Sequence, residues 1–227
     1  PCPHCGATLN KSHMQHAWVN KYDSTIKETV RQAKQVPVLI NYTVGKTRAQ
    51  KKPDASDLAL IERIEQSEIP YWYPTERMPE GSESRRNDPI GMTHVHRFYT
   101  KRNLWVLASL SIALKRENRV LFSSIVTKLC SQLVMYNLGK RGDGSLSGTL
   151  YIGSMLAETN PLWVIPGKIE AFSSALISCS HSTILETRSF SALNQSANTI
   201  DYLFLDPPFG SNISYSELNF LWESWLK

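Results

Sequence analysis

The feature that most constrains this chain is an apolar run that stops at two consecutive prolines. Residues 200–205 (IDYLFL) lead directly into the sequence DPPFG, and residues 214–226 then resume a helical spacing of apolar side chains. A short apolar run bounded by proline and glycine is typical of a buried strand, so the pattern predicts a strand, a stiff loop and a helix. Because ligands bind at the carboxyl ends of strands in open α/β sheets, a site is expected in this loop.

The residue types in the loop suit methyl transfer to an exocyclic amino group of a nucleobase. Such a nitrogen is a poor nucleophile because its lone pair is delocalised into the ring, so a site must accept its protons. Asp206 offers a carboxylate and Pro207 a backbone carbonyl, while Pro207 and Pro208 restrict the loop. Phe209 offers a stacking face to an extruded base. An ordinary turn that ends a strand is the alternative interpretation of these four residues.

The motif Asp206-Pro207-Pro208-Phe209 after an apolar strand resembles motif IV of the amino-methyltransferases. Residues 201–227, 72–110 and 36–46 are similar to one group of prokaryotic DNA methylases, so the resemblance covers most of the chain. It implies an α/β, Rossmann-like, S-adenosylmethionine-dependent methyltransferase fold with a helical and loop insertion. By the same resemblance, Asp206 and the Pro207 carbonyl hold the target amino group and Phe209 stacks on the base. Asp at the first position favours adenine-N6 over cytosine-N4.

The glycine-rich cofactor turn of such methyltransferases is not found in the sequence. Gly142-Asp143-Gly144 follows a predicted helix and is interpreted as a linker. The residues that bind S-adenosylmethionine are therefore unknown and are expected upstream of Pro1, in a longer protein of which this chain is an inactive fragment. The predicted division is a zinc-knuckle-like segment and strand at 1–45, an insertion for target recognition at 46–148, and the C-terminal part of the catalytic domain at 149–227.

Periodicity and turn residues predict the remaining elements. Strands are expected at 36–44, 149–152 and 182–186, and helices at 54–68, 100–117, 120–137 and 168–179. The basic segment 45–54 is predicted to be an exposed loop. Residues 69–93 contain several prolines and an aromatic triplet, which predicts a long ordered loop.

The middle of the chain carries the candidates for DNA binding, in which basic side chains neutralise phosphates and Asn or Arg reads base edges. They are Arg85, Arg86, Asn87, His94, His96, Lys101 and Arg102, with Arg97 among them and Tyr99 and Trp105 interleaved. A solvated loop followed by the first turn of a helix is an equally good interpretation.

The N-terminal sequence predicts a structural zinc site. Cys2 and Cys5, separated by two residues, form the half of a zinc knuckle that presents two thiolates to one metal. His13 and His16 are the candidates for the other two ligands, and the second cysteine pair often found in the resembling family is not present. His181 is interpreted as a plain surface histidine.

Composition sets wider limits on function. A net charge of +5 and a pI near 9.0 are compatible with a polyanionic partner. No apolar run spans a membrane, no secretory signal is recognised, and four cysteines suit a reducing compartment, so a cytoplasmic protein is expected. The leading hypothesis is a site-specific DNA adenine-N6 methyltransferase of restriction-modification type, and the alternatives are an RNA base methyltransferase and a non-catalytic DNA-binding module.

Overall fold

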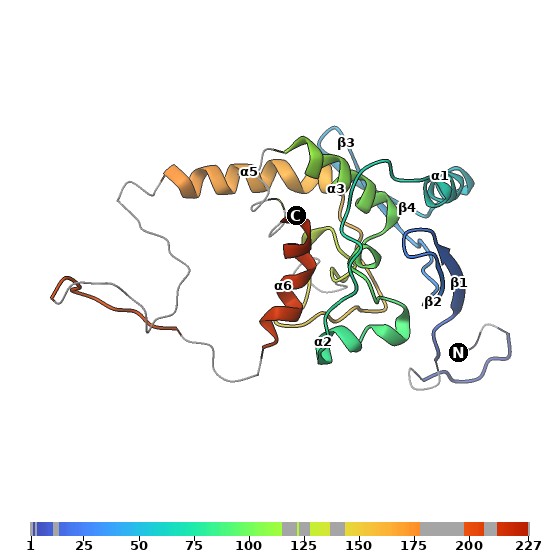
Figure 1. The fold of residues 1–227 in the computed structure, drawn as a ribbon. Helices are drawn as coiled ribbons and strands as arrows, with labels where there is room; N and C mark the ends of the chain where they lie inside the picture. The colour runs from blue at the N-terminus through green and yellow to red at the C-terminus, as the bar shows by residue number, and fades with distance from the viewer. Residues whose placement is uncertain are drawn as a thin grey trace.

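The structure is a computed structural model that describes residues 2, 4–10, 14–114, 122, 128–136, 144–177, 198–206 and 213–226. Figure 1 shows a helical body with two β-hairpins on one side. The strands are β1 (Trp18–Asp23), β2 (Glu28–Ala33), β3 (Ile40–Val44) and β4 (Thr47–Lys51). The α-helices are α1 (Ala55–Gln66), α2 (Ser82–Arg85), α3 (Lys101–Ala113), α5 (Pro161–Ile177) and α6 (Tyr215–Glu223). The 3-10 helices are η2 (Asp88–Ile90), η3 (Val95–Phe98) and η6 (Ser224–Leu226).

The described strands form two separate antiparallel hairpins. In the first, β1 pairs with β2 from Trp18 opposite Ala33 to Asp23 opposite Glu28. In the second, β3 pairs with β4 through a two-residue turn at Gly45 and Lys46, where Gly45 has φ +60°. A positive φ at this position suits glycine and favours a tight hairpin turn. No parallel sheet occurs among the described residues, so the Rossmann-like fold stays a prediction.

Two helix predictions at the start of the body are confirmed. Asp54 caps α1, because its side chain accepts from the backbone N–H groups of Ser56 and Asp57 while Asp57 accepts from the Asp54 N–H. This reciprocal capping box fixes the first turn of the helix. The hydroxyl of Thr100 caps α3 by accepting a hydrogen bond from the N–H of Asn103. The end of the second prediction, residues 115–117, lies outside the described residues.

The remaining sequence predictions are confirmed only in part. The strand expected at 36–44 begins at Ile40, and the loop expected at 45–54 contains β4, because the residues after Gly45 pair back onto β3. The helix expected at 168–179 starts earlier, at Pro161, where the Asn160 side chain accepts from the N–H of Leu162. The helix at 214–226 is confirmed as α6 and η6. Loop 69–93 is ordered, with α2 and η2 inside it.

Two predicted strands are wrong in the described residues, and one predicted helix is confirmed only in part. Residues 149–152 form no strand. They lie in an irregular segment in which Leu150 is buried and its two neighbours are not. The helix predicted at 120–137 is helical at residues 122, 128 and 129 but does not continue through 131–136, where Met135 instead makes isolated bridges with Gly144 and Leu156. Residues 200–205 form neither a strand nor part of the core. The strand predicted at 182–186 and most of 120–127 lie outside the described residues.

The core combines aliphatic and aromatic side chains and includes residues of α3, η3 and the C-terminal helices. Phe98 and Leu107 are fully buried, and Trp225 is 1% exposed. The Trp225 ring makes edge contacts with Trp72, Tyr99 and Phe122 and donates a hydrogen bond from Nε1 to the Tyr99 hydroxyl at 3.2 Å. Aromatic rings pack favourably in this edge-to-face geometry. The C-terminal end of the chain is thereby fixed to the aromatic residues of the middle region.

Candidate functional site

The predicted catalytic loop is only partly described. Asp206 is exposed and makes no hydrogen bond or ion pair with any other described residue, while Pro207, Pro208 and Phe209 lie outside the described residues. The preceding apolar residues are exposed as well, with Tyr202 at 81% and Phe204 at 75%. In Figure 1 the segment 198–206 lies well apart from the helical body. The prediction of a buried strand at 200–205 is wrong here because an interior strand needs neighbouring strands, and both described hairpins pair only within themselves.

The helix that follows the loop is, by contrast, firmly held. Glu217 in α6 is 3% exposed, and its carboxylate accepts a hydrogen bond from the N–H of Ser84 in α2 at 2.6 Å. Burial would raise the pKa of Glu217, but the hydrogen bonds from Ser84 lower it. Gly81 makes this approach possible, because a Cβ there would lie 2.1 Å from Cδ of Glu217. The residues after the loop are thus joined to the middle region through a buried carboxylate.

All eight predicted DNA-binding residues, Arg97 included, have partners within the chain. Arg85 binds Asp88 and the carbonyl of Met78, and Arg86 binds Glu83 and Thr149. Asn87, 1% exposed, donates to the carbonyl of Leu150 at 2.9 Å.

Three more members of that set, His94, Lys101 and Arg102, also bind partners within the chain. His94 Nδ1 lies 2.8 Å from the Thr93 hydroxyl, and Lys101 donates to the carbonyl of Glu65 at 2.8 Å. Burial lowers the pKa values of both His94 and Lys101. Arg102 forms an ion pair with Glu158, which raises the pKa of the arginine in spite of burial. The predicted set therefore contributes to the internal structure of the body, and Arg86 is its most exposed arginine.

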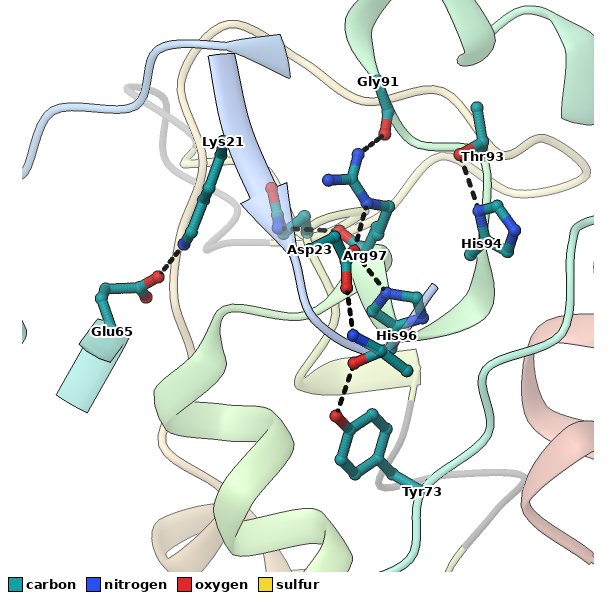
Figure 2. Close-up of polar contacts among 11 residues, drawn as sticks. Lys21, Asp23, Glu65, Tyr73, Gly91, Thr93, His94, His96 and Arg97 are labelled. Carbon is teal, nitrogen blue, oxygen red and sulfur yellow. Dashed lines mark hydrogen bonds and ion pairs between the residues drawn. The ribbon is translucent and has the colours of Figure 1, made fainter. Parts of the chain in front are cut away.

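The structure brings His96 and Arg97 onto a carboxylate that sequence reasoning did not single out. Figure 2 shows Asp23, at the end of β1, pointing at both side chains. Asp23 Oδ2 lies 2.8 Å from His96 Nε2 and 3.0 Å from Arg97 Nε, and Arg97 also donates to the carbonyl of Gly91 at 2.6 Å. Burial would raise the pKa of Asp23, but His96 and Arg97 hold it well below its usual range. No local pattern could have found this pairing, because the partners are more than seventy positions apart.

The same cluster fixes the turn between β1 and β2. The N–H of Thr25 donates to Asp23 Oδ1 at 3.1 Å, and the Thr25 hydroxyl lies 2.9 Å from the Tyr73 hydroxyl. Lys21 in β1 also forms an ion pair with Glu65. On the neighbouring strand, β2 passes so close to Gly91 that a Cβ there would lie 2.6 Å from the carbonyl oxygen of Arg31. The first hairpin is therefore bound to the body by charge, hydrogen bonds and close packing.

The N-terminal segment has some features of a metal knuckle. The N–H of Gly6 donates to the Cys2 carbonyl at 2.9 Å, and Gly6 has φ +69°, which suits a turn that brings two cysteines together. The backbone N–H groups of His4 and Cys5 lower the pKa of the Cys2 thiol, which favours the thiolate form that binds metals. His16 makes an edge contact with Trp18, and His13 lies outside the described residues. Among the described residues, no group of three or more His, Cys, Asp or Glu side chains is placed to bind a metal.

Comparisons with known proteins identify no relative of this chain. No family model matches the chain, and searches of curated proteins and of solved structures found no match either. Within the described part of the chain, no helix is both long enough and apolar enough to cross a membrane.

Proposed function

We propose that this chain contributes the target-base half of an S-adenosylmethionine-dependent DNA amino-methyltransferase that favours adenine N6. The observation that carries the proposal is Asp206, an exposed carboxylate with no described intramolecular partner, at the head of the sequence Asp-Pro-Pro-Phe. A carboxylate that is not used in structural pairing is available to accept a proton from a substrate amino group. Because the resemblance is to prokaryotic DNA methylases, whose DNA lies in the cytoplasm, we place the activity there.

The segment after the loop supports this proposal. A catalytic loop must be held on a rigid frame if its acceptor groups are to meet a base in one geometry. Here α6 is anchored on α2 by Glu217, and η6, which follows it, packs into the core through Trp225. On the N-terminal side of the loop, the exposed segment 198–206 lies apart from the body, so the described anchor is on the C-terminal side (Figure 1).

The methyl donor would supply an electrophilic carbon, and we assign it no binding residues. The described glycines include none in a turn that leads from a strand into a helix, since Gly45 joins two antiparallel strands and Gly81 precedes α2 after a loop. The roles derived from this chain are therefore confined to holding the target amino group through Asp206 and, by resemblance, to stacking through Phe209.

The decisive experiment is methyl transfer to oligonucleotides by the complete protein, with labelled S-adenosylmethionine. Asp206→Ala is expected to abolish turnover and leave DNA binding unchanged. Asp201→Ala is the matched control, because it removes an exposed carboxylate from the same segment. Normal turnover by Asp206→Ala would show that the active site lies elsewhere. Methylation of RNA alone would favour an RNA methyltransferase, and DNA binding without affinity for the methyl donor would favour a non-catalytic module.

We further propose that Cys2 and Cys5 bind a structural zinc ion, with His13 and His16 as candidates for the remaining positions. The support is the turn at Gly6 and the lowered pKa of Cys2. Co²⁺ bound in place of zinc is expected to give the ultraviolet charge-transfer band of a metal thiolate. Cys5→Ser should weaken that band and His16→Ala should change the ligand-field spectrum, whereas a spectrum without thiolate character would contradict the proposal.

A further inference from the structure

The second hairpin, which we call the β3–β4 ribbon (residues 40–51), has one face composed only of polar side chains. Residues opposite each other on paired strands share a face, and successive pairs alternate between faces. Asn41 therefore shares a face with its partner Gln50, and Thr43 lies on the same face with its partner Arg48. All four residues are exposed.

These four side chains have no structural task in the described part of the chain. None of them makes a side-chain hydrogen bond or ion pair with another described residue. Their polar groups are of the types that read base edges, since Asn and Gln pair with adenine and Arg pairs with guanine. The face thus presents unused donors and acceptors on a regular two-stranded frame.

The charge of the ribbon fits a polyanion. Residues 40–53 include Lys46, Arg48, Lys51 and Lys52 and no acidic residue. Lys51 is neutralised by Asp54 and Asp57, at 3.0 and 2.7 Å. The other three are exposed, and none has an ion-pair partner among the described residues. Lys46 lies at the tip of the hairpin, where it would reach a phosphate first.

Ion pairs to the start of α1 hold the base of the ribbon. The Lys51 side chain contacts both carboxylates of the α1 capping box. The contact with Asp57 raises the pKa of Lys51 most, and the contact with Asp54 raises it further. Figure 1 shows β4 leading directly into α1. A ribbon with a fixed base loses less conformational entropy when it binds than a free loop of the same sequence.

We propose that the β3–β4 ribbon enters the major groove of duplex DNA, where Asn41, Arg48 and Gln50 read base edges and Lys46 and Lys52 neutralise phosphates. The inference rests on the proposed function, because it assigns sequence recognition for that reaction to an element outside the catalytic loop. The major groove of B-form DNA, about 12 Å wide, admits a two-stranded ribbon. The deep and narrow major groove of A-form RNA does not.

The test is binding of the complete protein to a randomised pool of DNA duplexes, followed by sequencing of the retained fraction and by fluorescence anisotropy on the preferred duplex. Arg48→Ala and the double variant Asn41→Ala with Gln50→Ala are compared with Lys34→Ala. The control removes one exposed basic side chain from the end of the other hairpin. Arg48→Lys keeps the charge and loses the paired donors, so it separates base reading from phosphate attraction.

The expected result is a change in the selected sequence for both ribbon variants and weaker binding to the original duplex, by about 5-fold to about 100-fold per lost base contact. Lys46→Ala should lower the salt dependence of the binding constant by about one phosphate contact without changing the selected sequence. Lys34→Ala should leave both unchanged. Melting curves of each variant check that these exposed substitutions leave folding intact.

Ribbon variants that select the wild-type sequence with wild-type affinity would overturn the inference and leave the proposed function standing. Tighter binding of the wild-type protein to an RNA duplex than to DNA would also overturn the inference, since the inference places the ribbon in the major groove of DNA. Absence of any DNA binding by the wild-type protein would instead contradict the proposed function together with the inference.

Discussion

The two hairpins of this chain have the same architecture and differ in what their side chains do. The β1–β2 hairpin places Asp23 between His96 and Arg97 and passes closely over Gly91. The β3–β4 ribbon leaves Asn41, Arg48 and Gln50 exposed and is tied to the body at Lys51. The comparison teaches that polar residues of the same types are held in the structure where the fold supplies partners and stay available for binding where it does not.

The same comparison explains why the predicted and the proposed DNA-binding residues differ. Basic and amide side chains in the middle region suggest DNA binding by composition, yet Asn87, His96 and Arg97 are buried with internal partners. A donor that is already satisfied within the protein gains little by exchanging its partner for a base. The ribbon carries the same residue types with no such partners, and it is therefore the better candidate surface.

The largest expected effect comes from removing the carboxylate that binds the first hairpin. Asp23→Ala should lower the free energy of unfolding by about 3 kcal/mol, because it leaves the buried Arg97 guanidinium without its counter-charge. Urea denaturation followed by circular dichroism measures the loss. Thr43→Ala in the ribbon is the control and should change stability by less than about 0.5 kcal/mol. Equal losses in the two variants would remove the distinction between the hairpins.

A smaller effect is expected in acid. Because the pKa of Asp23 is lower in the folded than in the unfolded protein, its contribution to stability is fully present above the unfolded pKa of about 4. The contribution is lost as the pH falls from there towards the lower pKa of the folded state. The stability difference between the wild type and Asp23→Asn should therefore shrink below about pH 4. A difference that stays constant down to pH 2 would show that the ion pairs of Asp23 do not carry the stabilisation.

The smallest effect concerns the base of the ribbon. Asp54→Ala removes the N-cap of α1 and one partner of Lys51, and a lost cap costs about 1 kcal/mol. Since α1 has no buried residue, the loss should be local, with faster hydrogen exchange at the amides of Ser56 and Asp57. Asp54→Ser retains a capping oxygen and should restore most of the protection. Unchanged exchange in Asp54→Ala would show that the cap does not hold this turn.

Elements fixed by contacts between neighbours along the chain were predicted, and those that depend on contacts between distant residues were not. The helices α1 and α3 were predicted close to their observed starts, where Asp54 and Thr100 cap residues within three positions. The β1–β2 hairpin was not predicted, and residues 200–205 were assigned to a buried strand that the described structure does not contain. In both cases the outcome depends on residues far away in the chain, as the contact of Asp23 with His96 shows.

The sequence alone determined the helix caps, the aromatic content of the middle region and the Asp206-Pro207-Pro208-Phe209 motif, from which the proposed chemistry follows. The tertiary structure alone decided which charges are buried, how Glu217 reaches Ser84 past Gly81, and which hairpin keeps its polar face free. The physical reason is that a cap or a turn is stabilised by neighbours along the chain. Burial and pairing of a side chain depend on segments that the fold brings together.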